Sequence, residues 1–321
     1  MSDVLLDVRH LKKYFPITKD LELHAVDDVT YTLERGKTLG IVGESGCGKS
    51  TMGRCVLRLI EPTDGEVWFE GVNICKLGKS KIRELRKDMQ IIFQDPFSSL
   101  DPRMTVSQAI AEPIRAAKLM PGASKADLRK RVSELMDTVG LAARLTDSYP
   151  HELDGGRRQR IGIGRAIILN PSFIVCDEPV SALDVSIQAQ ILNLLDELQE
   201  SMGLTYIFIT HDLSVVNHFS DDIAVMYLGQ IVEKAPSEEL FRNPMHPYTQ
   251  ALLSAIPIPA VRERKERILL KGELSSPINP PDECRFYKRC NYASDQCAKG
   301  CPKLVETAPD HFVACHMVQQ D

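Results

Sequence analysis

Eight residues early in the chain have the types and spacing of a phosphate-binding loop. Gly43 to Ser50 matches the pattern G-x-x-x-x-G-K-[ST]. The glycines of such a loop let backbone N–H groups surround an anion, and a helix that begins there adds a partial positive charge. Lys49 is then expected to reach the β- and γ-phosphates of a nucleotide, and the Ser50 hydroxyl is expected to bind Mg²⁺.

The segments on either side of this loop favour the same interpretation. Residues 38–42 are apolar with β-branched members, which predicts a short buried strand. Residues 51–60 place apolar side chains at helical spacing, which predicts a helix. Because a strand, a glycine loop and a helix are the context that the pattern requires, a chance match in a glycine-rich turn is strongly disfavoured.

Two carboxylates follow another predicted buried strand, residues 173–176. Asp177 and Glu178 come directly after it. Carboxylates at the tip of a buried strand are costly unless a cation or hydrogen bonds meet them. Beside a phosphate-binding loop, Asp177 fits a direct or water-mediated partner of Mg²⁺, and Glu178 fits a base that orients the attacking water. Two acids that merely cap the next helix are the less favoured alternative.

Three more side chains stand at the ends of predicted strands. Gln94 follows residues 89–93, and His211 follows residues 206–209. Ligands of open α/β sheets bind at the carboxyl ends of strands, so both side chains could contact a nucleotide. Taken alone, the glutamine is a weak indication and the histidine would more often be a structural cap. Phe15, after Tyr14 near the end of an N-terminal strand, fits edge packing and adenine stacking equally well.

The rest of the pattern predicts an α/β protein with a helical insertion. Residues 4–8 and 25–33 are expected to form an N-terminal antiparallel sheet. Ser124 is a plausible N-cap with Asp127 at the capping-box position. Further elements are expected at residues 66–69 (strand), 81–87 (a helical turn), 105–118 and 124–139 (helices separated at Pro121-Gly122) and 186–201 (helix).

The composition is that of a soluble globular protein. The 321 residues are 43% hydrophobic and 26% charged, with a formal net charge of −5 and a mean hydropathy of −0.15. The absence of a basic excess argues against a nucleic-acid partner. No run of eighteen apolar residues occurs and the N-terminus does not resemble a signal peptide, so a cytoplasmic location is expected.

With these elements in place, the first 255 residues resemble the nucleotide-binding subunit of an ABC transporter. Two segments, Gln94–Arg103 and His246–Leu253, narrow the resemblance to the oligopeptide/dipeptide importer branch, which also includes nickel and glutathione importers. The family's motifs occur in its order: Walker A (Gly43–Ser50), Q-loop (Gln94), signature (Leu153–Arg157), Walker B (Phe173–Glu178), D-loop (Ser181–Asp184) and H-loop (His211).

The resemblance implies a P-loop NTPase core of the ABC type over residues 1–255, with an N-terminal antiparallel β-subdomain and a helical subdomain at about 101–166. It implies an Mg²⁺-dependent ATP hydrolase that powers peptide uptake. A nickel or glutathione importer ATPase, or a soluble ABC protein of DNA repair or translation, are the alternatives. The resemblance implies two kinds of partner at the cytoplasmic face of the membrane: a second ATPase subunit and two permease subunits. The second ATPase subunit is either a copy of this chain or a sister chain, and a heterodimer is favoured. An extracytoplasmic substrate-binding protein is implied as an indirect partner.

The resemblance also implies the site residues. The expected catalytic residues are Glu178, His211 and Gln94, and the expected Mg²⁺ ligands are Ser50, Gln94 and Asp177. The expected nucleotide-binding residues are Phe15, Gly43, Glu44, Ser45, Gly46, Cys47, Gly48, Lys49, Ser50, Thr51, Asp177, Asp154, Gly155 and Gly156.

The signature departs from the family's usual Leu-Ser-Gly-Gly-Gln. Asp154 and Arg157 stand in place of the serine and the glutamine. A serine hydroxyl there donates to the γ-phosphate held by the partner, whereas an ionised aspartate cannot donate and repels the phosphate. The equally weighted alternative is that Asp154 is a helix N-cap as good as serine.

Five of the nine cysteines crowd into the C-terminal extension, residues 256–321. Their spacing is C-x₅-C-x₆-C-x₃-C-x₁₃-C, which matches neither paired zinc-ribbon nor ferredoxin spacing. In a reducing compartment such a cluster favours metal over disulfides. The extension resembles that of peptide-importer ATPases, which implies a [4Fe–4S] cluster on Cys284, Cys290, Cys297 and Cys315, with Cys301 as a possible substitute. Zinc, or free or disulfide-linked thiols, remain the alternatives.

Overall fold

The computed structural model describes residues 3–117, 124–256, 267–272 and 276–319. By their contacts, these residues form two compact units, which are described separately. The first unit contains Met1–Cys75 and Phe208–Asp321, and the second contains Lys76–Ile207. The predicted division into residues 1–255 and 256–321 is a different one and stays a prediction. Among the helices of the described residues, none is long and apolar enough to cross a membrane.

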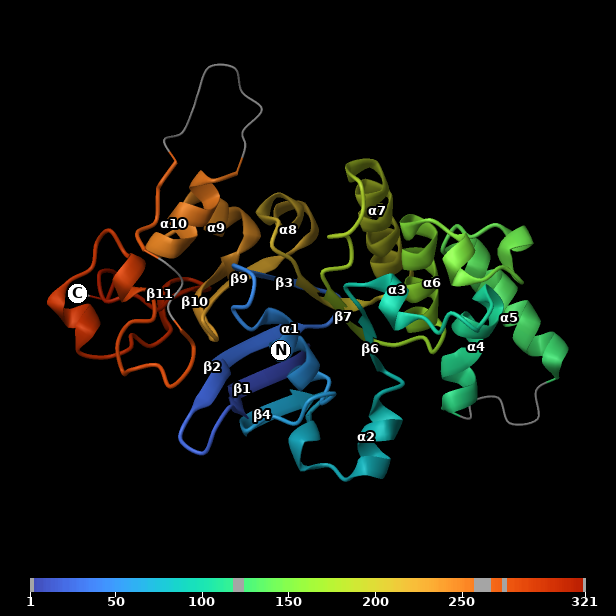
Figure 1. Ribbon diagram of the computed structural model, residues 1–321, viewed down its shortest axis with the longest axis horizontal. Coiled ribbons are helices and arrows are strands. Elements are labelled where there is room, and N and C mark those ends of the chain that lie inside the picture. The colour runs from blue at the N-terminus through green and yellow to red at the C-terminus, as the bar shows by residue number, and fades with distance from the viewer. Residues whose placement is uncertain (1–2, 118–123, 257–266, 273–275, 320–321) are drawn as a thin grey trace, which may run out of the picture. The chain divides into compact units, whose positions relative to one another are not determined.

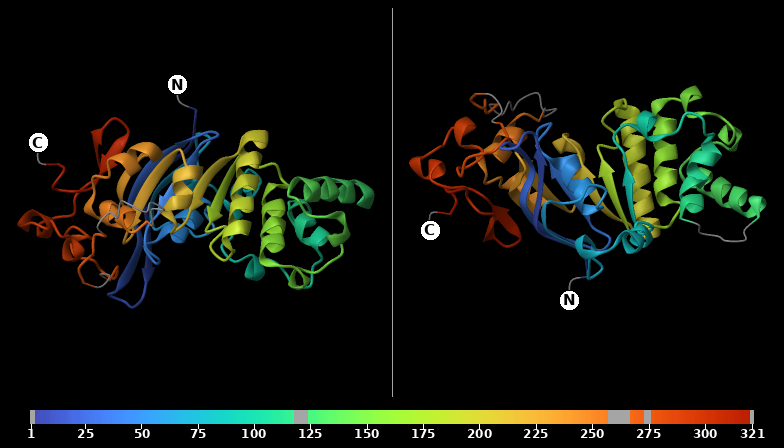
Figure 2. Two further views of the ribbon diagram at one scale, coloured as in Figure 1. Left: turned by 90° about the horizontal axis from the view of Figure 1, so that it is seen from above. Right: turned by 60° about the horizontal axis from the view of Figure 1, so that its bottom comes forward.

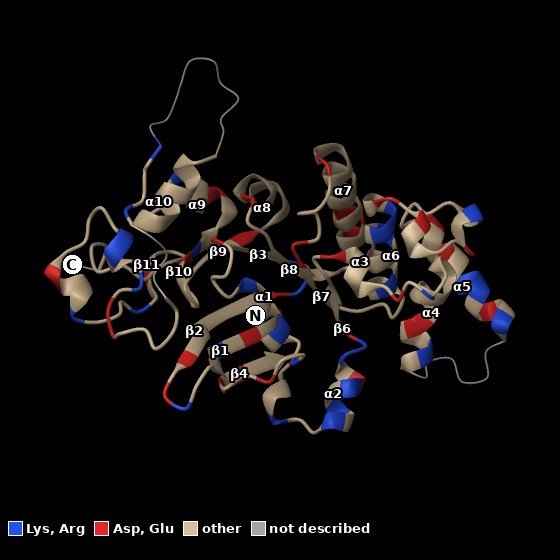
Figure 3. Cartoon of the chain, viewed as in Figure 1, with Lys and Arg blue, Asp and Glu red and all other residues tan. Residues whose placement is uncertain are grey.

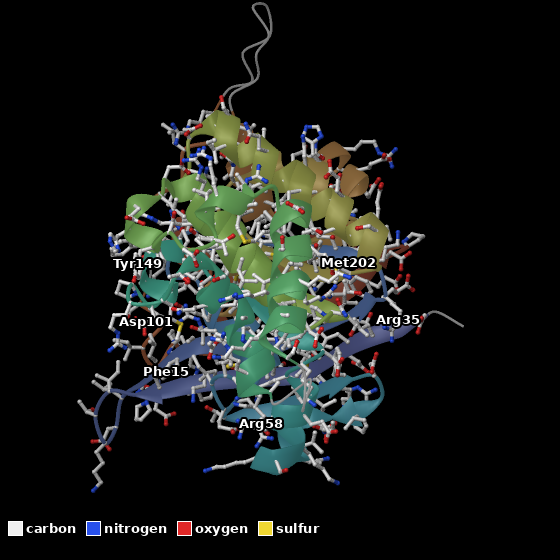
Figure 4. All side chains as sticks on the ribbon, turned by 90° about the vertical axis from the view of Figure 1, so that its right-hand side faces the viewer. Phe15, Arg35, Arg58, Asp101, Tyr149 and Met202 are labelled. Carbon is white, nitrogen blue, oxygen red and sulfur yellow. The ribbon has the colours of Figure 1, made fainter. Side chains whose placement is uncertain are left out.

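The first unit begins with the predicted antiparallel sheet, whose strands have the order β2-β1-β4-β5 (Figure 1). Burial alternates along the second half of β2, where Val29, Tyr31 and Leu33 are buried and the residues between them are exposed, so one face of this strand covers a core. Phe15 and Arg35 lie toward opposite ends of this strand pair (Figure 4). The bounds are β1 Val4–Pro16, β2 Glu22–Glu34, β4 Asp64–Phe69 and β5 Val72–Asn73, followed by the turn η1 Ile74–Lys76.

The same unit contains a second sheet, built around β3 (Thr38–Val42). All five residues of β3 are buried, as expected for an apolar strand of a parallel sheet. β3 pairs in parallel with β9 (Asp222–Tyr227), which pairs antiparallel with β10 (Gln230–Pro236). The helices of this unit are α1 Lys49–Val56, α8 Leu213–Phe219, α9 Ser237–Arg242 and α10 Pro247–Ser254.

Helix α1 is shorter than the sequence indicates. The apolar spacing predicts a helix to residue 60, but α1 ends at Val56. Arg58 has a φ of 49°, in the left-handed region, and this conformation terminates the helix. The N–H groups of Leu59 and Ile60 instead donate to the carbonyl oxygen of Arg54 at 2.8 and 3.3 Å. The apolar side chains at 59 and 60 therefore belong to a turn.

The C-terminal extension is more ordered than the predicted irregular segment. β11 (Val305–Ala308) and β12 (His311–Val313) form an antiparallel pair, and β12 continues the sheet by pairing with β10. The extension lies beside β10 and α10 in both views of Figure 2. Of two 3₁₀ turns, η4 (Tyr287–Arg289) is followed directly by Cys290, and η5 (Asp295–Ala298) contains Cys297. These strands are too short to produce a recognisable period in the sequence.

The second unit combines a parallel strand pair with the helical insertion. β6 (Met89–Ile92) and β7 (Phe173–Asp177) pair in parallel. Lysines and arginines recur along α5 (Figure 3). The chain returns to the first unit within β8 (Thr205–Ile209). The helices and turns of the second unit are α2 Lys79–Leu85, α3 Pro96–Ser99, α4 Val106–Ala116, α5 Lys125–Thr138, η2 Ala143–Leu145, η3 Pro150–Glu152, α6 Gly155–Ile167 and α7 Val185–Met202.

The capping box predicted for α5 is confirmed. The Ser124 hydroxyl accepts from the Asp127 N–H, and the Asp127 carboxylate accepts from the Ser124 N–H. Each side chain thereby satisfies a backbone donor that a helix start leaves open. The expected Pro121-Gly122 break lies outside the described residues.

Candidate nucleotide-binding site

The loop between β3 and α1 has a backbone that only glycine can supply at two positions. Gly43 has a φ of 151° and Gly48 a φ of 106°. A β-carbon on Gly43 would lie 2.1 Å from the carbonyl oxygen of Met226, and one on Gly48 would lie 2.0 Å from that of Ala25. The loop is therefore fitted closely against β9 and β2 in a conformation that turns N–H groups toward an anion.

Lys49 places its positive charge at this loop. The residue is only 4% exposed. Its Nζ donates to the carbonyl oxygen of Gly43 at 2.7 Å and to that of Glu44 at 3.0 Å. A buried ammonium held by loop carbonyls is positioned to exchange these partners for phosphate oxygens. Burial raises the pKa of the neighbouring Cys47 thiol, so this cysteine is a packing residue rather than a nucleophile.

His211 lies at the end of a strand that adjoins β3. The Thr210 N–H donates to the carbonyl oxygen of Ile41 at 3.1 Å, so the end of β8 lies beside the strand that leads into the loop. The helix that follows is capped by Asp212, whose carboxylate accepts from the Ser214 N–H at 2.8 Å. The cap predicted as the alternative role of His211 is therefore supplied by its neighbour, and the His211 side chain is exposed.

Phe15 is half-buried near the end of β1. The Lys13 Nζ lies 4.8 Å from the centroid of the Phe15 ring, a cation–π contact. Tyr14 stacks on His24 with ring centroids 3.8 Å apart and donates to Asp27. Both of the interpretations given to Phe15 are compatible with these contacts.

The second unit brings Gln94 and Glu178 together. Ile92 of β6 pairs with Cys176 of β7, so the two residues follow parallel strands at the same register. The Gln94 Nε2 donates to the Glu178 Oε2 at 2.8 Å. Glu178 has a φ of 48°, a conformation unusual for a non-glycine residue that is found preferentially at functional sites. A carboxylate held in this way can orient a water molecule.

The preceding carboxylate, Asp177, is the last residue of β7 and is 1% exposed. A buried carboxylate is retained where hydrogen bonds or a cation compensate the loss of solvation. It is therefore a suitable ligand for Mg²⁺ bound to a nucleotide.

Asp154 is the N-cap of α6. Its Oδ1 accepts from the Arg157 N–H at 2.8 Å, and its Oδ2 lies 3.1 Å from the Arg157 Nη1. The capping role proposed from the sequence is confirmed. Both side chains are about half exposed, so the carboxylate and the guanidinium face solvent.

Gly156 has no room for a side chain, because a β-carbon there would lie 2.6 Å from the Ile187 Cγ2 of α7.

Comparison with known proteins decides the family. Residues 26–181 match the family model of ABC transporters, and residues 232–297 match that of the oligopeptide/dipeptide transporter C-terminal region. The oligopeptide transport ATP-binding protein AppF of Bacillus subtilis is 51% identical over 98% of both chains. OppF of Salmonella typhimurium, which has the same description, is 52% identical over 97% of this chain and 96% of its own. The chain belongs to the ABC transporter ATPases of the oligopeptide/dipeptide branch.

Solved ABC ATPases have the same fold. A dimeric structure of the ATP-binding cassette MJ0796, in a post-hydrolysis state with ADP and Pi, superimposes with a TM-score of 0.67 at 29% identity; it covers 72% of this chain and 98% of that one. The cassette cbiO1 of Clostridium perfringens, part of the transporter complex cbiONQ, has a TM-score of 0.66 at 28% identity and covers 75% and 92% of the two chains.

In this ABC ATPase the predicted residues divide between the units. The first unit contains Phe15, Gly43–Thr51 and His211, and the second contains Gln94, Asp154–Gly156, Asp177 and Glu178. Sequence reasoning missed two residues that contact the Walker A loop. The Tyr248 hydroxyl accepts from the Glu44 N–H at 2.9 Å, and the Arg289 guanidinium binds the Glu44 carboxylate. Tyr248 lies within the segment His246–Leu253 that narrows the family resemblance, but no spacing reveals its contact with Glu44 or that of Arg289, because both contacts join segments more than 200 residues apart.

Four of the five cysteines in the extension line one cavity of about 80 Å³: Cys284, Cys290, Cys297 and Cys315. Cys301 is not among its lining residues, and its Sγ donates to the Gln230 Oε1 at 3.2 Å. Burial raises the pKa of the Cys284 thiol to about 12. Within the described residues, no three His, Cys, Asp or Glu side chains are arranged as a ready metal site. The cavity therefore gathers the thiols of the predicted set without holding them in a closed ligand arrangement.

Proposed function

We propose that this chain is the ATP-hydrolysing subunit of an importer that takes up di- and oligopeptides across the cytoplasmic membrane. The observation that carries the proposal is the end-to-end similarity to oligopeptide transport ATP-binding proteins, including the C-terminal region specific to that branch. A nickel or glutathione importer ATPase is the nearest alternative, and a soluble ABC ATPase is a more distant one.

We propose for the binding residues the roles that the family resemblance implies. The backbone of Gly43–Thr51 would surround the phosphates, and Lys49 would neutralise their charge. Phe15 would stack on adenine. Mg²⁺ would neutralise and orient the phosphates, held by Ser50, Gln94 and Asp177.

We assign the hydrolytic step to Glu178. Its carboxylate would orient the attacking water, and the hydrogen bond from Gln94 would fix its direction. His211 would donate to the γ-phosphate. The signature residues Asp154, Gly155 and Gly156 would face the nucleotide of a second ATPase subunit. Catalysis would rest on positioning and charge stabilisation.

The proposed partners are a different second ATPase subunit and two permease subunits, through which the chain would be held at the membrane's cytoplasmic face. An extracytoplasmic substrate-binding protein would deliver the peptide. Two residues then have distinct tests in the assembled transporter. Lys49→Ala should abolish high-affinity ATP binding, whereas Glu178→Gln should bind ATP but stop hydrolysis. Wild-type turnover by the Glu178→Gln complex would remove Glu178 from its assigned role.

The cargo is tested by uptake. Cells that carry the complete transporter should accumulate a labelled tripeptide, and the Glu178→Gln variant should not. Labelled nickel and glutathione serve as the competing cargoes. ATP-dependent uptake of nickel or glutathione without peptide uptake would show that the proposed cargo is wrong. If the chain purifies without any membrane subunit, a soluble ABC protein is favoured instead.

We further propose that the extension binds a [4Fe–4S] cluster through Cys284, Cys290, Cys297 and Cys315. The donor set fits, because such a cluster requires four thiolates and these four line one cavity. We assign this cluster a structural rather than an electron-transfer role. Protein purified without oxygen should be brown, with roughly four irons per chain.

Matched variants identify the ligands. Cys290→Ser should remove most of the iron, whereas Cys301→Ser should retain it, because Cys301 contacts Gln230 instead of lining the cavity. Zinc without iron or sulfide in anaerobic protein would contradict the cluster. Loss of iron from Cys301→Ser equal to that from Cys290→Ser would contradict the ligand assignment.

A further inference from the structure

The Walker A loop contains an acidic side chain whose charge is compensated from the C-terminal extension. Glu44 is the second residue of the loop. The Arg289 Nη1 donates to the Glu44 Oε2 at 2.7 Å, and the Arg289 Nη2 donates to the Glu44 Oε1 at 3.0 Å. This is the bidentate geometry that gives an arginine–carboxylate pair both strength and direction.

The arginine is held in place by buried aromatic rings. Arg289 ends η4 and is 8% exposed. Its guanidinium lies 5.8 Å from the centroid of Tyr227 and donates to the Tyr227 hydroxyl at 3.4 Å. Tyr227 in turn contacts Tyr248 and Phe286, with centroids 4.7 and 5.2 Å away. The guanidinium of an arginine stays protonated at every physiological pH, so Arg289 always supplies a positive charge to Glu44.

Glu44 is thereby fixed at three points. Its N–H donates to the Tyr248 hydroxyl, its carbonyl oxygen accepts from Lys49, and its carboxylate accepts from Arg289. The buried Nε of Arg289 has no hydrogen-bond partner among the described residues. The guanidinium is therefore oriented toward Glu44 even though its Nε–H then makes no hydrogen bond.

Charge gives this arrangement a functional consequence. A carboxylate in a loop that binds the phosphates of ATP opposes binding, because like charges a few ångströms apart repel. A paired carboxylate presents no net charge to the ligand. We propose that Arg289 is a positioning residue for ATP, which neutralises Glu44 and fixes the Walker A loop in its binding conformation. This inference depends on the proposed binding of phosphate by Gly43–Ser50.

The test is a double-mutant cycle on the full-length chain, with the Kd for a fluorescent ATP analogue as the readout. Arg289→Met should raise the Kd about tenfold, because it leaves Glu44 charged and unpaired. Glu44→Gln should change it by no more than about threefold, because the lost charge-assisted bond weakens binding while the unpaired guanidinium of Arg289 attracts phosphate. The double variant should bind within about threefold of wild type, since it has no carboxylate left to repel phosphate. Arg289→Lys should recover part of the loss.

The controls separate this role from a general effect on folding. Lys288→Met changes the adjacent residue, whose side chain is 63% exposed, and should leave the Kd unchanged. In the assembled complex, Arg289→Met should raise the KM for ATP while kcat stays within about twofold. If Glu44→Gln does not restore binding to Arg289→Met, Arg289 does not act by neutralising Glu44.

The same titration distinguishes this inference from the proposed function. If wild-type protein does not bind the nucleotide, or if Lys49→Ala binds it as well as wild type does, the assignment of the phosphate site fails. If Lys49→Ala loses binding while Arg289→Met retains wild-type affinity, the phosphate site stands and the role of Arg289 is refuted.

Discussion

Replacing Asp154 by serine should make the two ATP sites of the assembled transporter more alike. In the proposed heterodimer, the signature of this chain faces the nucleotide bound to the partner, so a carboxylate there weakens only that site. The other site combines Lys49, Glu178 and His211 of this chain with the partner's signature. This chain's own Walker A site should therefore perform most of the hydrolysis, provided that the partner has a Leu-Ser-Gly-Gly-Gln signature.

The structure sets the size of the effect. At ~4 Å, two like charges cost roughly 1 kcal/mol in water and roughly 4 kcal/mol at an effective dielectric of about 20. Asp154 is 59% exposed, which favours the lower part of this range, and its exposed pair with Arg157 contributes little in compensation. We therefore expect Asp154→Ser to accelerate the weaker site about tenfold, or about 1.4 kcal/mol. Serine also caps helices, so α6 should stay intact.

The assay is ATP hydrolysis by the complex with each Walker B glutamate replaced separately. Glu178→Gln should cost far more activity than loss of the corresponding glutamate of the partner subunit, and adding Asp154→Ser should narrow the difference. Asp154→Asn is the matched control, because it keeps a capping side chain and removes the charge while its amide supplies an N–H donor in place of the serine hydroxyl. Equal losses from the two glutamate variants, with no response to Asp154→Ser, would show that the aspartate is merely a helix cap.

Two further predictions concern the first unit. Burial lowers the pKa of His246 to about 4. Between pH 6.5 and 4 the unfolded chain therefore binds more protons than the folded one, so the free energy of unfolding should fall as the pH falls. The expected decrease is about 2 kcal/mol between pH 6.5 and 5. The variant His246→Asn keeps a capping side chain for α10, so in denaturant titrations its free energy of unfolding should not show this decrease. A pH dependence equal to that of the wild type would contradict the role of His246. Gly43→Ala should abolish ATP binding because its β-carbon would meet the carbonyl oxygen of Met226. Gly46→Ala should weaken binding less, because its φ of 79° strains alanine but its β-carbon would meet no atom within 4 Å. Equal binding by the two variants would refute the steric argument.

The sequence was sufficient for the features that local chemistry specifies. The loop from Gly43 to Ser50 needs glycines at fixed positions, and a buried strand such as β3 needs a continuous apolar run, so both are visible as patterns. The sequence also placed Gln94 and Glu178 at the ends of predicted strands, whereas the parallel pairing that brings the two residues together is visible only in the structure. Helix caps at Ser124 and Asp154 follow from side chains that satisfy nearby N–H groups.

What the sequence could not reveal depends on tertiary contacts. The end of α1 at Val56 is decided by a left-handed residue, Arg58, that no composition rule marks. The strands β11 and β12 are stabilised by pairing with β10 rather than by their own propensity. Cys301 is separated from the other four cysteines of the extension by its contact with Gln230, and spacing alone cannot distinguish five similar thiols.

Glu44 shows why the extension has to be considered together with the ATP site. The motif permits any residue at position 44, and a glutamate there would by itself oppose the binding of a polyanion. The compensating charge lies 245 positions further along the chain and is positioned only when η4 is folded against Tyr227. Because Cys290 follows Arg289 directly and lines the cysteine cavity, the fold of that cavity and the charge state of the loop depend on the same short segment. Coupling of this kind is reciprocal: if the folded extension strengthens ATP binding, bound ATP must stabilise the extension by the same free energy.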